Sequence, residues 1–385
     1  MRFDYLSWNS DLLSKFTYKI TEKNRDSKIK NVICNSANVG LIPQIDYFDK
    51  AIANNENIDG YYIIRKNDFV YNPRKSSNAP YGPINIYTYD TVGVVSPLYL
   101  CFKVKGINKK YLYYYFRGNS WHRYMYMNGD SGARSDRVSI KDDVFFNMPI
   151  SFPDNTTQEK IAHFLTLIDR RIETQIKIID SYKLLINVIR DKLIYPSGLK
   201  ERKLKSFIKI YNGYAFKSDS YIDNGSFKIV TIGNVTGERY INKNNLNTIN
   251  DIPEDIQTHQ VLHKGSILVS LTGNVGRVSI CDIDTCLLNQ RVALVCPINV
   301  NEKYIYHILS STKFRNHMIS LSQGAAQKNI GITDILNYTV PVSSSDEIEK
   351  IVNILENIEE KICIEMKILI YLQYIKSYLL KNMFV

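Results

Sequence analysis

The chain has 385 residues, of which 44% are hydrophobic and 23% are charged. This length is too great for one ordinary domain and suits two, each with enough apolar residues for a normal core. The formal net charge is +11, which predicts an acidic partner, with nucleic acid first and an anionic membrane surface second.

No apolar run approaches the roughly 20 residues that a membrane-spanning helix needs. The segment that begins at Met1 also lacks the apolar region of a secretory signal. None of the cysteines forms a C-x-x-C pair, so we expect reduced, mostly buried thiols rather than a metal site. These features together predict a cytoplasmic protein. The cysteines are Cys34, Cys101, Cys281, Cys286, Cys296 and Cys363.

The first third of the chain has an α/β pattern. Residues 61–64, 68–71 and 99–104 are predicted strands, and residues 111–126 are a predicted short helix. The aromatic run 111–116 in this helix could stack on nucleic acid bases. We favour the other interpretation, in which an aromatic-rich helix packs on its own domain.

A long helix is predicted to follow. A strand ends at Pro149, and Thr156 and Glu159 have the spacing of a capping box, in which the two side chains satisfy free backbone N–H groups. Pro196 and Gly198 are expected to end the helix. Its apolar residues recur at steps of three and four, which is a helical pattern: Ile161, Leu165, Ile168, Ile172, Ile176, Ile179, Tyr182, Ile186, Ile189 and Leu193.

The second half repeats this layout. Residues 227–232, 266–270 and 293–296 are predicted strands, residues 304–321 a short helix, and Ser344 with Glu347 a second capping box. Moving the apolar positions of the first long helix 190 residues along the chain gives apolar residues again, except that Lys376 replaces the equivalent of Ile186. The others are Ile351, Leu355, Ile358, Ile362, Met366, Leu369, Leu372, Leu379 and Met383.

The sequence therefore predicts two α/β (α+β) domains, 1–153 and 198–343, each followed by a long helix, 154–197 and 344–385. An apolar seam about 50 Å long must be buried. We expect the two helices to pair as an antiparallel coiled coil with pseudo-two-fold symmetry. The alternative is that each helix packs on its own domain. The residues expected to carry the seam are Ile161, Leu165, Ile168, Ile172, Ile179, Ile351, Leu355, Ile358, Ile362 and Leu369.

Catalytic motifs are missing from the sequence. It has no G-x-G-x-x-G, no P-loop, and no Asn/Asp-Pro-Pro-aromatic motif, to which residues 72–74 come closest. His259 and His263 have zinc-ligand spacing without the accompanying glutamate, and a surface turn is the better interpretation. Asp346 and Glu349 fit a charged helix start and do not indicate a nuclease. No metal site is predicted.

Residues suited to DNA contact are more plentiful. Arginine can read guanine with two hydrogen bonds, asparagine and glutamine can read adenine, and lysine and serine more often contact phosphates. Several candidates lie in glycine-flanked loops. The alternative for each is a solvated surface side chain. The candidates are Arg74, Lys75, Ser76, Asn78, Arg117, Arg123, Arg134 and Arg137 in the first domain, and Thr272, Asn274, Arg277, Asn289, Gln290, Arg291, Gln327, Lys328 and Asn329 in the second.

The whole chain resembles the specificity subunit of Type I restriction–modification enzymes. Residues 149–169 resemble the central repeated region of that family, and residues 211–218 resemble the entry to its recognition domains. Residues 267–276 and 288–291 are similarly typical, and residues 31–73 resemble another class of first recognition domain. The first domain lacks the Gly213–Phe216 motif of the second, so the resemblance assigns its site residues less directly.

This resemblance implies that each domain reads one half of a split, asymmetric site in double-stranded DNA, with the helices as a spacer. It further implies two methyltransferase (modification) subunits that carry S-adenosylmethionine and flip and methylate adenines, with restriction (motor–nuclease) subunits as optional partners. The chain itself would hold no cofactor and catalyse nothing, and would work at the nucleoid in the cytoplasm.

Two other functions are considered. A fused methyltransferase would need a cofactor motif, and the sequence shows none. A two-module adaptor for protein or glycan partners would bind them without the steep salt dependence of DNA binding.

Overall fold

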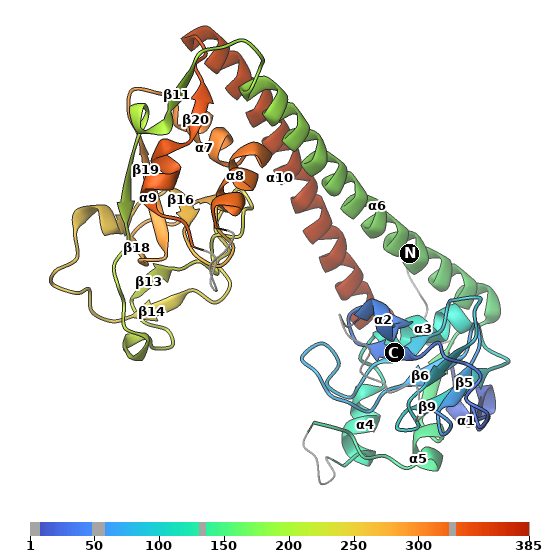
Figure 1. The fold of residues 1–385 in the computed structure, drawn as a ribbon. Coiled ribbons are helices and arrows are strands. Elements are labelled where there is room, and N and C mark those ends of the chain that lie inside the picture. The colour runs from blue at the N-terminus through green and yellow to red at the C-terminus, as the bar shows by residue number, and fades with distance from the viewer. Residues whose placement is uncertain (1–7, 48–57, 131–135, 323–328, 385) are drawn as a thin grey trace. The chain divides into compact units, whose positions relative to one another are not determined.

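The computed structural model describes residues 8–47, 58–130, 136–322 and 329–384. The chain forms two compact units (Figure 1). Unit 1 consists of Met1–Ile176 and Ile368–Val385, and unit 2 of Lys177–Lys367. Each unit contains one α/β domain and a stretch of both long helices, α6 (Asn155–Ile194) and α10 (Ser345–Asn382).

The main sheet of unit 1 is antiparallel, with the strand order β2-β9-β6-β7. These strands are β2 (Thr17–Lys19), β9 (Leu100–Val104), β6 (Phe69–Tyr71) and β7 (Ile84–Ile86). Three two-stranded ladders accompany it: β1 (Asn9–Leu12) with β10 (Pro149–Phe152), β3 (Ile33–Ser36) with β4 (Gly40–Pro43), and β5 (Tyr62–Ile64) with β8 (Gly93–Val95). The helices before α6 are α1 (Leu13–Phe16), α2 (Gln44–Tyr47), α3 (Lys109–Arg117), α4 (His122–Asn128) and α5 (Asp142–Phe146).

Unit 2 has two four-stranded sheets. The first has the order β12-β19-β16-β17, with β12 (Ile208–Asn212), β19 (Val292–Pro297), β16 (Ile267–Ser270) and β17 (Val278–Ile280). The second has the order β14-β13-β18-β15, with β14 (Asn247–Ile249), β13 (Phe227–Val230), β18 (Cys286–Leu288) and β15 (Val261–Leu262). A ladder joins β11 (Glu201–Lys203) to β20 (Thr339–Pro341), and the shorter α-helices are α7 (Glu302–Leu309), α8 (Thr312–Leu321) and α9 (Ile332–Asn337).

The two units share one framework. In each, the strand that precedes the long helix pairs with the first strand of its domain, β10 with β1 and β20 with β11. The main sheets also have the same order of strands, and three short helices follow in corresponding places. The remaining strands differ, because unit 1 has two small ladders where unit 2 has a second sheet. The two units thus combine a shared framework with different remaining strands.

The predicted strands are confirmed, but both predicted short helices are broken in two. Residues 111–126 divide into α3 and α4 around Gly118, whose N–H bonds the carbonyls of Tyr114 and Tyr115. Residues 304–321 divide into α7 and α8 because the Ser311 hydroxyl accepts a hydrogen bond from the Phe314 N–H and starts a new helix. The aromatic run of α3 packs in the core, as favoured, with Tyr111, Tyr114, Tyr115 and Phe116 buried.

The two long helices begin differently. At α10 the predicted capping box is confirmed: Glu347 accepts from the Ser344 N–H at 2.9 Å, and Ser344 Oγ from the Glu347 N–H. At α6 the prediction is wrong, because Asp154 is the cap and accepts from the Thr157 N–H at 3.0 Å. The helix begins two residues earlier than the Thr156 box requires.

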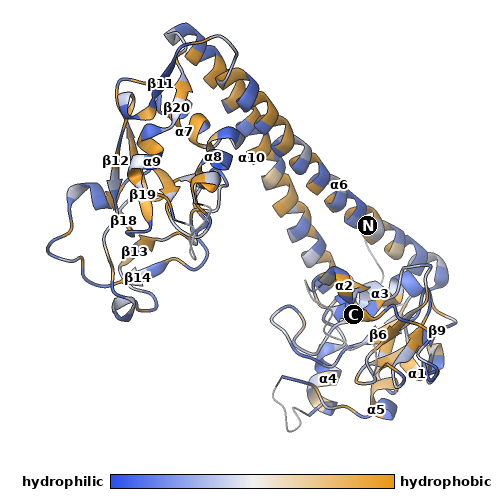
Figure 2. Cartoon of the chain, in the orientation of Figure 1, coloured by the Kyte–Doolittle hydropathy of each residue, from blue (hydrophilic) through white to orange (hydrophobic). Residues whose placement is uncertain are grey.

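α6 and α10 pack together. In unit 1 the start of α6 shares a core with the end of α10, where Leu165 belongs to the same cluster as Leu380 and Met383. In unit 2 the end of α6 shares a core with the start of α10, where Ile186 and Leu355 are buried. The pairing is therefore antiparallel, and both helices mix apolar and polar residues along their length (Figure 2). The alternative of two independent helices is wrong.

The seam differs from the sequence prediction at one pair of positions. Ile176 and Met366, which the periodicity assigned to it, are 42% and 39% exposed. Gln175 and Glu365 are buried in their place. Of the residues expected to carry the seam, Ile161, Leu165, Ile179, Ile351, Leu355 and Ile362 are buried, and Ile168, Ile172, Ile358 and Leu369 are half-buried.

Lys376, the one polar break in the predicted repeat, has a partner in unit 1. Its ammonium lies 2.5 Å from Asp169 Oδ1 on α6. The long aliphatic stem lets a lysine line an apolar seam while its charge reaches a carboxylate.

Candidate nucleic-acid interface

The structure brings five sequence candidates of unit 1 together at one cavity of about 440 Å³. The cavity forms where the loop after β6 meets the turn after β3, the segment before β9 and residue 137. Five of its lining residues come from the sequence candidates: Arg74, Lys75, Ser76, Asn78 and Arg137. Sequence reasoning did not select the others used below, Asn35, Asn38 and Asn72, because nothing local distinguishes them from other loop amides.

A network of amides builds the cavity wall. The Asn35 side chain donates to the Val70 carbonyl at 2.8 Å and accepts from Asn85 Nδ2 at 2.7 Å. Asn72 Nδ2 donates to the Asn35 carbonyl at 3.0 Å. Gly82 permits this close packing, since a Cβ there would lie 2.1 Å from the Asn72 carbonyl oxygen. The wall is therefore held by its own hydrogen bonds.

Two further candidates of unit 1, Arg117 and Arg123, are not among the residues that line this cavity. Arg117 supports it from behind, because its Nη1 donates to the Ala37 carbonyl at 3.1 Å. Arg123 is exposed on α4. Arg134 lies outside the described residues.

Three loops of unit 2 meet beyond β16 and β18. The Leu271 N–H donates to the Arg291 carbonyl at 3.0 Å, and Thr272 forms a β-bridge with Asn329. Gln290 and Arg291 are exposed, whereas Asn289 is buried and accepts from the Arg291 N–H. The structure thus places together the candidates Thr272, Asn274, Arg277, Asn289, Gln290, Arg291 and Asn329. Gln327 and Lys328 lie outside the described residues.

Gly213 fixes the base of this loop cluster. A Cβ at Gly213 would lie 2.3 Å from the Asn289 carbonyl oxygen, and the neighbouring Tyr214 forms a β-bridge with Asn289. Any side chain here must therefore displace the backbone that carries the 289–291 loop.

We predict that Gly213→Ala destabilises unit 2 by about 1–3 kcal/mol, which is typical of overpacking. Hydrogen exchange of the segment around Asn289, measured in the intact chain, should become faster. Gly233→Ala is the matched control, because the nearest atom to its Cβ would be Thr231 Oγ1 at 3.7 Å, an ordinary contact. Equal exchange in the two variants would contradict the prediction.

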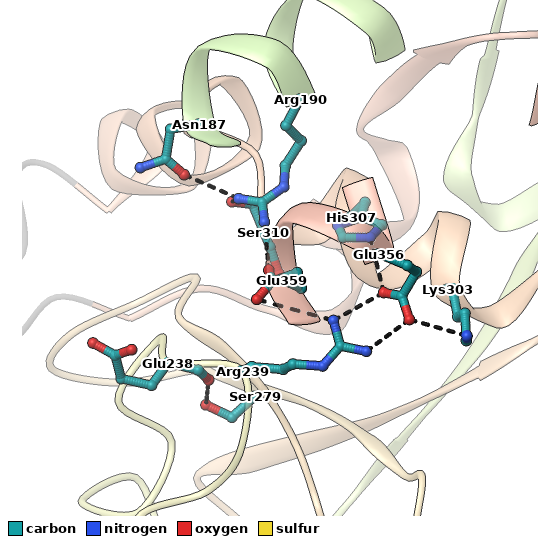
Figure 3. A network of polar contacts seen from close by, with 10 residues as sticks. All are labelled: Asn187, Arg190, Glu238, Arg239, Ser279, Lys303, His307, Ser310, Glu356 and Glu359. Carbon is teal, nitrogen blue, oxygen red and sulfur yellow. Dashed lines mark hydrogen bonds and ion pairs between the residues drawn. The ribbon is translucent and has the colours of Figure 1, made fainter. Parts of the chain in front are cut away.

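A buried charged network joins the unit 2 domain to the helices (Figure 3). Arg190 of α6 donates to Glu359 of α10 at 3.0 Å. Arg239, from the loop between β13 and β14, makes two hydrogen bonds of 2.8 and 2.9 Å to Glu356 of α10. Lys303 of α7 lies 3.0 Å from the same carboxylate.

His307 of α7 completes this network. Its Nε2 lies 3.2 Å from Glu356 Oε1, and its Nδ1 is buried without a hydrogen-bond partner among the described residues. Burial, with the nearby Arg190 and Arg239, lowers the pKa of His307 to about 4. The ring is therefore neutral at pH 7, with Nε2–H as the donor to Glu356.

The pKa values of the two carboxylates at the centre of the network, Glu356 and Glu359, are shifted in opposite directions. Burial alone would raise the pKa of Glu356, but hydrogen bonds from His307, Arg239 and Lys303 hold it well below its usual value. Burial raises the pKa of Glu359 and outweighs the attraction of Arg190 and Arg239. Hydrogen bonds thus offset the cost of burying the charge of Glu356, whereas the attraction of Arg190 and Arg239 does not offset that cost for Glu359.

Unit 1 has a smaller counterpart at the corresponding place. The Tyr114 hydroxyl of α3 donates to Asp169 of α6 at 2.8 Å and lies 3.2 Å from Thr166 Oγ1. In both units, therefore, the first helix after the main sheet places a polar side chain against the long helix of that domain.

Other kinds of site find no support. Within residues 8–47, 58–130, 136–322 and 329–384, no group of three or more His, Cys, Asp or Glu residues could hold a metal ion. His259 instead stacks on Tyr211, with ring centroids 4.6 Å apart. All six cysteines are free, and Cys101, Cys281 and Cys286 are buried. No helix among the described residues has the length and apolar character to cross a membrane.

Two modules that share one framework and differ in their remaining strands define a protein built from a duplicated domain. The sequence model of the family described as the Type I restriction modification DNA specificity domain matches residues 11–180 and again 196–374. The chain therefore belongs to this family and carries two of its specificity domains.

Solved structures show a similar fold. A chain from a study of complex assembly and conformational transition in the type I R-M system has a TM-score of 0.60 and 13% identity, with 97% of this chain and 96% of that chain covered. The S subunit of a Type-I restriction-modification system from M. genitalium has a TM-score of 0.52 and 16% identity, with 98% and 96% covered. The likeness extends over the whole chain in both cases.

Proposed function

We propose that this chain is the DNA-recognition subunit of a Type I restriction–modification complex and reads a bipartite, asymmetric site. The observation that carries the proposal is the double match to a DNA specificity domain, on two units that share a framework and differ in their remaining strands. Two modules that share a framework and differ in their remaining strands suit two different half-sites. The net charge of +11 favours binding to the phosphate backbone.

The proposed partners are two modification subunits, each bringing S-adenosylmethionine to methylate one adenine per half-site, with restriction subunits as optional further partners. Both long helices carry large apolar side chains that are exposed, as partner-binding surfaces do. On α6 these include Leu184, Leu185 and Val188, and on α10 Ile370, Tyr371, Tyr374 and Tyr378. In this proposal the chain supplies recognition, holds no cofactor and catalyses nothing itself, and the complex works at the nucleoid in the cytoplasm.

The proposal is tested by co-expressing the chain with its modification subunit and mapping methylated adenines in the host DNA. We expect methylation at a split sequence, with one adenine in each half and a fixed gap between the halves. Methyl transfer by the purified chain alone would instead identify a fused enzyme. A complex that binds a protein or glycan independently of salt, with no affinity for duplex DNA, would identify an adaptor.

We further propose that the helix pair sets the distance between the half-sites. A deletion of seven residues from the middle of α6 and seven from α10 removes about 10 Å from the pair and preserves the heptad pattern. The gap tolerated in methylated sites should then become shorter. Duplexes with graded gaps, methylated by the complex with the intact or the shortened chain, provide the measurement. An unchanged preferred gap would rule out the spacer role.

A further inference from the structure

The cavity of unit 1 places three basic side chains together. Arg74 and Arg137 face each other across an isolated antiparallel β-bridge, and backbone hydrogen bonds on both sides hold it: Lys75 N to Asp136 O at 2.8 Å and Val138 N to Pro73 O at 2.9 Å. Both arginines and Lys75 line the cavity. Like charges directly opposite each other on paired strands are destabilising. A bound anion between them would remove that cost.

Arg74 and Arg137 bring positive charge to the lining of the cavity. Its lining residues include no aspartate or glutamate among those that the structure describes. The nearby Asp136 lies 3.7 Å from Arg74 Nε, with the two side chains 51% and 68% exposed. An exposed pair at that distance contributes little. The cavity therefore favours a ligand rich in negatively charged acceptors.

The amides at the cavity cannot easily read a base. An asparagine that reads adenine must present both its carbonyl and its amino group. The Asn35 side chain already donates to Val70 O and accepts from Asn85. Asn72 donates to the Asn35 carbonyl and accepts from the Arg74 N–H. Both amides are thus committed to the wall on both sides, so they shape the cavity rather than read sequence.

We infer that this cavity is a phosphate clamp, in which Arg74 and Arg137 hold one or two backbone phosphates of the DNA and position unit 1 without reading bases. Asn78 belongs to the wall as well, since its Nδ2 donates to Asn38 Oδ1 at 2.8 Å. Base reading in unit 1 then falls to other residues. This inference rests on the proposed function. It assigns to the Arg74 and Arg137 contacts a share of the affinity of unit 1 for DNA and none of its sequence specificity.

The test uses the complex of the full chain with its modification subunits and a duplex that carries the site mapped by methylation. Binding is measured from 50 to 200 mM salt for the wild type, Arg74→Gln, Arg137→Gln and the double variant. Each lost phosphate contact lowers the slope of log affinity against log salt by about 0.9. Raising the salt from 50 to 200 mM weakens binding by some factor, and that factor should be roughly tenfold smaller for the double variant than for the wild type. The double variant should lose the same factor of affinity on the mapped site and on duplexes that carry single base-pair changes in it.

Arg25→Gln is the matched control, because Arg25 is exposed in unit 1 and does not line the cavity. It removes the same charge and should leave the slope near the wild-type value. Fluorescence of Trp8 and Trp121, both in unit 1, checks that each variant is folded.

The clamp would be overturned by an unchanged slope in the double variant, by a loss of discrimination confined to one base pair, or by a slope change equal to that of Arg25→Gln. Calorimetry, in which inorganic phosphate is titrated into the complex that contains the chain, tests whether the cavity binds free phosphate instead of DNA phosphate. Tight binding of inorganic phosphate that both substitutions abolish, with the DNA slope unchanged, would assign the cavity to free phosphate and also overturn it. Failure of the wild-type complex to bind any duplex would instead reject the proposed function.

Discussion

Arg190→Met should destabilise unit 2 by about 3–5 kcal/mol, the usual cost of removing one partner of a buried ion pair. The Arg190 and Glu359 side chains are only 5% and 10% exposed and lie 3.0 Å apart. Arg190 also donates to the Ser310 carbonyl at 3.0 Å, which would lose its donor. Arg239 is a poor substitute, because its Nη1 lies 4.0 Å from Glu359 and both of its Nη atoms already donate to Glu356.

The experiment separates the two units by their probes. Both tryptophans, Trp8 and Trp121, belong to unit 1, so tryptophan fluorescence during urea unfolding follows that unit. Hydrogen exchange of α7 follows unit 2. Arg190→Met should speed exchange in α7 and leave the fluorescence transition near its wild-type midpoint.

Two further variants control for the buried charge. The double variant Arg190→Met/Glu359→Met should recover most of the loss, because it leaves no unpaired carboxylate. Lys183→Met breaks a pair with Glu238 in which both side chains are more than a third exposed, and should cost less than about 1 kcal/mol. If Arg190→Met costs no more than Lys183→Met, the pair does not hold the unit together.

The long helices could be predicted because their signal is local and repeated. Steps of three and four positions identify one face of a helix, and the match after 190 residues identified a partner of the same length. The prediction failed at Ile176, where Gln175 is buried instead. Hydrophobicity alone favours isoleucine, whereas the crossing of two helices decides which of two adjacent residues faces inward.

The residue types of the candidate site could be predicted from the sequence, but which of these residues lie together could not. Arg74 and Arg137 were both chosen from the sequence, yet only the β-bridge between them shows that they share a cavity. Arg239 and Glu356 were not chosen, since 117 residues separate them and neither lies in a motif. Tertiary pairing of charges over such separations leaves no local pattern in a single sequence.

Acid should weaken unit 2 through His307. Burial lowers its pKa to about 4, against an ordinary value of 6.5, so between these values the unfolded chain binds a proton that the folded chain excludes. The stabilising contribution is therefore present above pH 6.5 and is lost as the pH falls from 6.5 to 4. The shift corresponds to about 3 kcal/mol. The lowered pKa of Glu356 acts in the same direction at still lower pH, and the raised pKa of Glu359 acts in the opposite one.

His307→Gln isolates this contribution, because the glutamine amide can still donate to Glu356 and does not titrate. Exchange protection of α7, followed in the intact chain from pH 7 to pH 4 and corrected for intrinsic rates, should fall less in this variant than in the wild type, by about 3 kcal/mol at pH 4. His263→Gln makes the same replacement at an exposed histidine of unit 2 and should follow the wild-type curve. Parallel curves for all three proteins would show that His307 takes up its proton as readily in the folded chain as in the unfolded one. The neutral Nε2–H donor assigned to the network would then be wrong.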